Sequence, residues 1–163
     1  MRPVTAVAVC AMAIGVVPGS ARADLLSPEC QVFSAPIVTS FFVDGCASPF
    51  GICTAGSIDG GLLGGSTTFA VTDIQPGDSV DQLQYAGELV ITTPNGVLTI
   101  HDKGVLNQSE ATFFEIDQIV SGTGSFENVT GLLFSQGTSN PTGFEGIIAG
   151  HICGAGGSNI SSR

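Results

Sequence analysis

The sequence predicts an all-β fold, a single antiparallel β-barrel of about eight strands, with a β-sandwich as the alternative. Short runs rich in β-branched residues alternate with turn residues, and no long amphipathic helical pattern is present. Glycine contributes 23 of the 163 residues, as expected for a chain with many turns. Neither face of the longer runs is cleanly polar, which favours a closed barrel with covered walls, or an oligomer, over an open sheet.

Turn signals divide the chain into eight expected strands. Asn95-Gly96 tolerates positive φ angles and predicts a tight hairpin between the runs on either side. Residues 102–104, Asp-Lys-Gly, predict a further turn or a glycine bulge that bends the strand. The glycine-rich residues 56–65 fit a flexible loop or a bulged strand equally well. The expected strands are residues 31–33, 37–43, 67–74, 88–93, 97–102, 112–121, 132–136 and 144–153.

The N-terminus has the pattern of an export signal. Residues 1–3 supply a short positive start, residues 4–17 are apolar, and Ala21-Arg22-Ala23 offers a small-x-small cleavage site. Residues 1–23 are therefore expected to be a signal peptide, and the 140 residues 24–163 a single all-β domain. The apolar run is too short to span a bilayer comfortably. We expect a secreted protein, extracellular or periplasmic.

Without the signal peptide the chain is strongly acidic. All 14 acidic residues remain but only Lys103 and Arg163 of the four basic ones, so the formal net charge is −12. Such a surface repels phosphate backbones and anionic lipids, so neither nucleic acid nor a membrane is expected as a partner. No phosphate-binding glycine loop is present, and no cofactor is expected. A small apolar ligand and a second copy of the chain remain open as partners.

Four cysteines follow the signal peptide, at Cys30, Cys46, Cys53 and Cys153. An even number in an exported chain indicates two disulfides, for which three pairings are possible. The short segment between Cys46 and Cys53 can turn back on itself. We therefore favour that pair together with Cys30–Cys153, which would tie the first strand to the last. Zinc is not expected, because the four lack a CxxC pair and thiolates would be oxidised outside the cell.

A glycine-spaced pattern occupies residues 121–132, SGTGSFENVTGL, and GFEGIIAG follows at residues 143–150. Together they resemble the dirigent and allene-oxide-cyclase-like β-barrel group, whose members carry a GTGxFxxxTGxL-type hairpin before a glycine-spaced closing strand. The resemblance covers the last third to half of the mature chain. It implies an eight-stranded barrel, often oligomeric, with an apolar cavity in which some members cyclise or steer reactive small molecules. The shared pattern is structural, so no catalytic residue is transferred.

The same segment can be interpreted without the family. Gly122 and Gly124 allow a tight crossing of the chain, because glycine has no Cβ to obstruct a close approach. Phe126 is expected to insert into the core. Gly131 is expected to begin the next strand.

Glu115 and Asp117 are the candidate catalytic residues. They lie two positions apart on one expected strand and therefore share a face. If that face lines a cavity, desolvation and mutual repulsion raise the pKa of a carboxyl and make it a general acid or base. If it faces water, the pair forms only a solvated edge, and this second interpretation is the one we favour from the sequence. Tyr85, the only tyrosine, is either a proton donor or a half-buried ring.

No metal site is expected. His101 and His151 could contribute to a metal site or an acid–base pair only if the barrel brought their strands beside those of the acidic residues Glu115, Asp117 and Glu145. Exposed or structural histidines are the more common case. The turn around Pro76 offers carboxylates to calcium without the spacing of an EF-hand, from Asp73, Asp78 and Asp81.

Three functions remain open from the sequence. The first is a secreted barrel that binds an apolar small molecule in its interior without catalysis. The second is a cyclase or isomerase that acts on a reactive small molecule in the cavity, assisted by a carboxylate such as Glu115. The third is an extracellular structural or adhesion protein. The first two require an apolar cavity and the third does not, so the interior of the barrel separates them.

Overall fold

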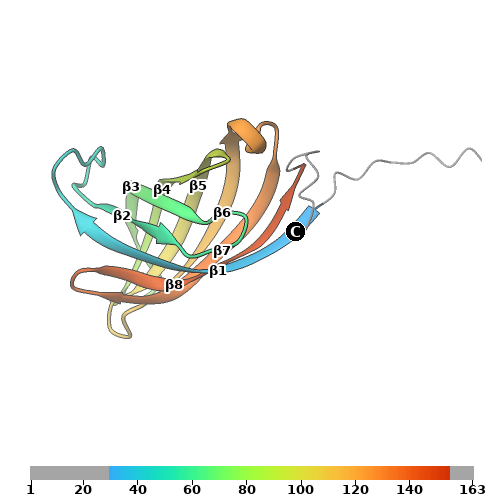
Figure 1. Cartoon of the computed structure of the whole chain (residues 1–163). Coiled ribbons are helices and arrows are strands. Elements are labelled where there is room, and N and C mark those ends of the chain that lie inside the picture. The colour runs from blue at the N-terminus through green and yellow to red at the C-terminus, as the bar shows by residue number, and fades with distance from the viewer. Residues whose placement is uncertain (1–29, 155–163) are drawn as a thin grey trace, which may run out of the picture.

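The computed structural model describes residues 30–154, which form a closed antiparallel barrel of eight strands (Figure 1). Each strand pairs with the next along the chain, and the last pairs back on the first. The barrel prediction is confirmed and the sandwich is wrong. The expected signal peptide lies outside the described residues. The strands are β1 (Cys30–Phe42), β2 (Cys53–Ile58), β3 (Gly65–Pro76), β4 (Gln82–Thr93), β5 (Gly96–Asn107), β6 (Thr112–Gly122), β7 (Thr130–Asn140) and β8 (Gly143–Cys153).

One end of the barrel is filled by a hydrophobic core. Inward side chains alternate with outward ones along each strand, and at this end most inward positions are large and apolar. A short 3₁₀ helix, η1 (Gly124–Phe126), closes this end, and Phe126 is completely buried. The expected insertion of Phe126 into the core is confirmed. A side chain at Gly124 would collide with the carbonyl of Asn95, and φ at Gly124 is +62°, so glycine is required there.

The first strand is longer than predicted. Residues 31–33 and 37–43 were expected to be separate, but β1 runs unbroken through Pro36. The Pro36 carbonyl accepts a hydrogen bond from the amide of Asp59, so the backbone of Pro36 points toward β2. The paired ladder of β2 already ends at Ile58. The missing amide proton of proline therefore removes no ladder hydrogen bond.

Two further strand predictions are corrected. The strand β2 was not predicted, because its small residues give a weak β signal; Gly56 is needed there, since a side chain would collide with the backbone of β1. The glycine-rich residues 56–65 thus begin as a strand and continue as a loop. The expected turn at residues 102–104 is wrong: β5 continues to Asn107, and its irregularity against β6 falls at Thr99 instead.

Two disulfides join the four cysteines in the pairing that the sequence favoured. Cys30 and Cys153 lie opposite each other where β1 begins and β8 ends, so this bridge connects the two strands that close the barrel. The same position is where the two ends of the described chain meet in Figure 1. The bridge spans 123 residues along the chain.

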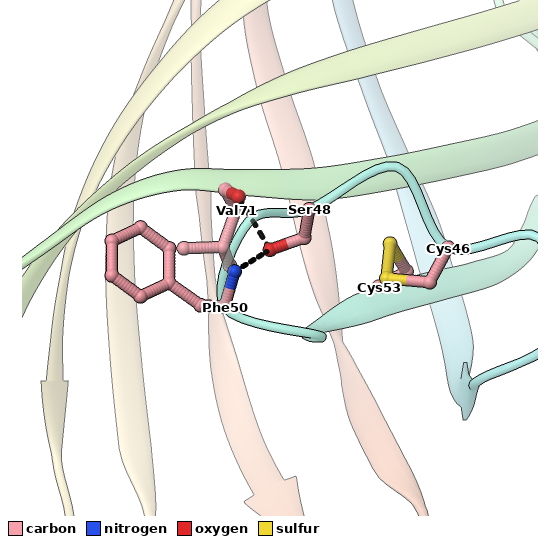
Figure 2. The surroundings of a disulfide bond; sticks show 5 residues. All are labelled: Cys46, Ser48, Phe50, Cys53 and Val71. Atoms are coloured by element: carbon pink, nitrogen blue, oxygen red, sulfur yellow. Dashed lines mark hydrogen bonds between the residues drawn. A yellow bond between two sulfur atoms is a disulfide. The ribbon is translucent and has the colours of Figure 1, made fainter.

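The second bridge, Cys46–Cys53, closes the loop between β1 and β2 (Figure 2). Within this loop the hydroxyl of Ser48 donates a hydrogen bond of 2.6 Å to the carbonyl of Val71 in β3. The same hydroxyl accepts a hydrogen bond from the amide of Phe50. The loop is therefore fastened both to itself and to the neighbouring strand, at the end of the barrel opposite the core.

The outer wall carries apolar side chains among polar ones, as the sequence predicted. Phe114 of β6 stacks on Phe134 of β7 with ring centroids 6.1 Å apart, and both rings remain partly exposed. Ile116 and Ile147 are exposed by nearly half. No helix within residues 30–154 has the length and hydrophobicity needed to cross a membrane.

Candidate functional site

The end of the barrel opposite the core holds a cavity of about 100 Å³. Its walls are mostly apolar and include Ile74, Leu83 and Leu106 near the strand ends. The rings of Phe113 and Phe144 also line it, in edge-to-face contact at 5.3 Å. A space of this size accommodates several water molecules or a small apolar group, and it is smaller than the roughly 300–1,000 Å³ typical of drug-sized ligands.

Three carboxyl groups lie close together at or beside this cavity, and we call Asp102, Glu115 and Asp117 the acid cluster. One oxygen atom from each lies within 4.8 Å of the other two. Asp102 and Asp117 are direct partners across β5 and β6, and Glu115 precedes Asp117 by two residues on the same face. The exposed fractions of Asp102 and Asp117 are 2% and 0%. Asp102 and Glu115 line the cavity itself.

The position of Glu115 and Asp117 corrects the interpretation favoured from the sequence. They do not form a solvated edge, because their strand face points into the barrel together with Phe113 and Ile119. Their role in catalysis remains a prediction. Asp102 was missed because residues 102–104 were interpreted as a turn. The signal that could have identified it is its alternation with the apolar residues of the same strand, Leu98 and Ile100.

Hydrogen bonds satisfy part of the acid cluster. The hydroxyl of Tyr85 donates to Oε1 of Glu115 at 2.5 Å. The hydroxyl of Ser135, from β7, donates to Oδ2 of Asp117 at 2.6 Å. Oδ1 of Asp102 and Oδ1 of Asp117 are buried and receive no hydrogen bond from a hydroxyl or amide group. The carboxyl groups of Asp102 and Asp117 can hydrogen-bond to each other when one of them is protonated. When both are ionised, two acceptor oxygens are left unsatisfied inside the protein, which is costly unless a proton, a ligand or a solvent molecule meets them.

The ring of Tyr85 is held over a glycine. Tyr85 in β4 pairs directly with Gly104 in β5, and a Cβ atom at Gly104 would overlap the tyrosine ring. Phe69 contacts the same ring edge-on, with centroids 6.3 Å apart. Gly104 thus gives space to an aromatic ring rather than bending the strand, and this places the phenol against Glu115. Tyr85 is a largely buried ring whose hydroxyl donates a hydrogen bond to Glu115, and a role for Tyr85 as a proton donor stays a prediction.

Burial raises the pKa of every carboxyl in the acid cluster, because charge is poorly solvated there. The pKa of Glu115 is raised to about 8 by burial and by the charge of Asp117, although the hydrogen bond from Tyr85 partly opposes the rise. The pKa of Asp102 is raised to about 11 by burial and by the charges of Glu115 and Asp117. Burial also raises the pKa of Asp117. At neutral pH the cluster therefore carries fewer than three negative charges.

The other candidate residues do not join the cluster. His101 and His151 are exposed on the outer wall, so the barrel separates them from the buried carboxyls. Asp73 accepts a hydrogen bond from Gln75 in an exposed position. Within residues 30–154, the aspartates around Pro76 form no close group of ligands. Among the carboxylates, histidines and cysteines of residues 30–154, the acid cluster is the one group of three with ligand atoms this close together.

The chemistry of the cluster allows two roles. As protonated acids, the carboxyls can donate hydrogen bonds or a proton to a molecule in the cavity. As carboxylates, they can hold a cation, but calcium takes six to eight oxygen ligands and most of this cavity is apolar.

Comparison of the chain with known proteins found no match among protein families, curated proteins or solved structures.

Replacing Tyr85 with phenylalanine is expected to raise the pKa of Glu115 further above about 8, because the hydroxyl now lowers it by hydrogen bonding to the carboxylate. The loss of this buried hydrogen bond should cost about 1–3 kcal/mol of stability. Carbon-13 NMR titration of the Glu115 carboxyl measures the first effect. Gln84→Ala, on the exposed side of the same strand, is the control; an unchanged or lower pKa in Tyr85→Phe contradicts the prediction.

Proposed function

We propose that the barrel binds a small, largely apolar molecule in its cavity, with the polar group of that molecule held by the acid cluster. The observation that supports this proposal is the pair of unsatisfied, buried oxygens of Asp102 and Asp117 beside an otherwise apolar cavity. Burying carboxyl groups whose oxygens are only partly satisfied costs stability, so three carboxyl groups close together in one interior are better explained by a ligand than by the fold.

The surroundings of the cavity are consistent with this proposal. The apolar walls and rings favour a hydrocarbon body, and the barrel interior at this end is not filled by side chains. Two disulfides fit a protein that matures in an oxidising compartment, and we propose secretion on that basis together with the N-terminal pattern. An apolar cavity is also what the resemblance to the dirigent and allene-oxide-cyclase-like group implies.

Acid catalysis is the second candidate function. Its support is the raised pKa of Glu115, about 8, in a side chain that lines the cavity. A carboxylic acid that remains protonated at neutral pH can transfer a proton to a bound carbonyl or alkene, and confinement would then direct a cyclisation or isomerisation. An adhesion or structural role has less support, because it requires neither the cavity nor the buried acids.

Filling the cavity tests ligand binding directly. Thr39 of β1 lines the cavity, and its hydroxyl is buried without a partner. Thr39→Leu is expected to stabilise the protein by about 1 kcal/mol, since an unsatisfied hydroxyl is exchanged for apolar contacts. It is also expected to abolish the ligand mass that native mass spectrometry should detect on protein isolated from its own source.

The matched control is Val38→Leu, which changes the neighbouring residue on the exposed outer face of the same strand. It should keep both the ligand and the wild-type stability. If the wild-type protein carries no ligand and binds no small apolar probe, or if Thr39→Leu binds as well as wild type, the cavity is not a binding site and the proposal is wrong.

A further inference from the structure

We propose that the ligand is an organic cation, a primary amine whose ammonium group lies among Asp102, Glu115 and Asp117 while its apolar body fills the cavity. This inference rests on the proposed function and names the chemical class of the ligand. It is carried by the spacing of the three carboxyl oxygens, by the two that receive no hydrogen bond from a hydroxyl or amide group, and by the apolar walls beside them.

The spacing of the acid cluster suits an ammonium group. An ammonium on a carbon has three N–H donors and no acceptor, pointing about 109° apart. With N–H···O distances of about 2.8 Å, its three acceptors would lie about 4.6 Å from one another. One oxygen from each of Asp102, Glu115 and Asp117 lies within 4.8 Å of the other two. This upper limit on the separations is compatible with an ammonium group. Asp102 and Glu115, which line the cavity, can each accept a hydrogen bond from it, while the buried Asp117 adds negative charge beside them.

When the acid cluster is ionised, the hydrogen bonds already present leave acceptors rather than donors available. Tyr85 and Ser135 donate to one oxygen each of Glu115 and Asp117, while Oδ1 of Asp102 and Oδ1 of Asp117 receive no hydrogen bond from a hydroxyl or amide group. An anionic ligand would be repelled by the ionised carboxylates. A neutral alcohol would bring a single donor, which can satisfy one of the open acceptors. An ammonium group satisfies several at once and also neutralises charge.

No side chain of the described protein supplies a positive charge to the cluster. The basic residues within residues 30–154 are Lys103, His101 and His151, and all three are exposed on the outer wall. The acid cluster is therefore a set of three carboxyls without a counter-ion from the part of the chain that the structure describes. A charge of the opposite sign has to come from a bound molecule or from protons.

The cavity walls favour an organic cation over a metal ion. Phe69, Tyr85, Phe113 and Phe144 line the cavity, and aromatic faces attract a cation and pack against its hydrocarbon part. A divalent metal ion would have to give up most of its bound water on entering this cavity. Only three carboxyl groups could replace that water, because the walls beside them are apolar. An amine presents its apolar part to the walls and its charge to the acid cluster.

A pair of probes with the same carbon skeleton tests the inference. Isobutylamine and isobutyl alcohol are titrated into the full, disulfide-bonded protein at pH 7, with binding measured from backbone amide NMR shifts. The amine is expected to bind about tenfold more tightly than the alcohol. Asp102→Asn is expected to abolish this preference. Glu88→Gln, which removes an exposed carboxylate on the outer face of β4, is expected to keep it.

Each outcome separates the inference from the proposed function. Equal binding of the two probes overturns the amine inference and leaves a cavity that binds small molecules. Binding of neither probe overturns both. Stabilisation by calcium alone that depends on Asp102, with no effect of the amine, shows an inorganic cation site and also overturns the inference. If Asp102→Asn does not fold, Glu115→Gln replaces it in the same comparison. The relative affinity of the wild-type protein for the amine and the alcohol tests the inference even without a variant.

Discussion

Replacing both Cys30 and Cys153 with serine is expected to lower the free energy of unfolding by about 5 kcal/mol. The bridge closes a loop with a sequence separation of 123 residues, and the entropy that it removes from the unfolded chain grows with loop length. The Cys46–Cys53 bridge closes a loop with a separation of only 7. Its removal is expected to cost about 2.5 kcal/mol, about half as much.

Denaturant unfolding of the two double-serine variants measures both losses under the same conditions. The Cys46–Cys53 variant is the natural control, because it also removes one bridge and two sulfur atoms. An equal loss in the two variants would show that loop length does not determine the contribution of the bridges. Retained stability without Cys30–Cys153 would show that the hydrogen bonds between β1 and β8 close the barrel unaided.

The protein is expected to be more stable at pH 4 than at pH 8, by several kcal/mol. In the unfolded chain Glu115 and Asp102 titrate near their ordinary pKa values of 4.5 and 3.8, whereas in the fold these values rise to about 8 and about 11. Between the two sets of values the folded protein binds more protons than the unfolded chain, so stability falls as pH rises. The loss begins near pH 4 and continues through pH 8.

Neutral replacements test this pH dependence. Asp102→Asn removes one ionisable group from the acid cluster and is expected to raise stability at pH 8 while flattening the profile between pH 4 and pH 8. Glu145→Gln changes an exposed carboxylate on the outer face of β8 and should leave the profile as in wild type. Denaturant unfolding at several pH values measures the profiles. If the free energy of unfolding of the wild-type protein rises from pH 4 to pH 8, the predicted pH dependence is wrong.

Much of the barrel follows from local patterns. The hairpin at Asn95-Gly96 was predicted because its turn residues have a strong backbone preference, and alternation along β6 placed Glu115 and Asp117 on one face. The strand β2 was missed, because its side chains are small and its role depends on close contact between backbones at Gly56. Local sequence patterns do not predict such contacts, because they depend on segments that are distant in the sequence.

The acid cluster could be predicted only in part for a similar reason. Alternation shows which residues share a face but not which face is inside, so Glu115 and Asp117 were placed together and assigned to solvent. Asp102 stands beside a lysine and a glycine and therefore looked like part of a turn. Gly104 in fact leaves room for Tyr85 from the neighbouring strand. The pairing of β4, β5 and β6 brings these groups together, and pairing is a property of the whole barrel.

The bridge between Cys30 and Cys153 also changes what one cut by a protease can do. Because it joins the first and last strands, the polypeptide between them is a covalent ring of peptide bonds closed by sulfur. Hydrolysis of one bond in any hairpin opens this ring without releasing a fragment. A nicked molecule would still hold its pieces together, and dissociation would require a second cut or reduction of the bridge.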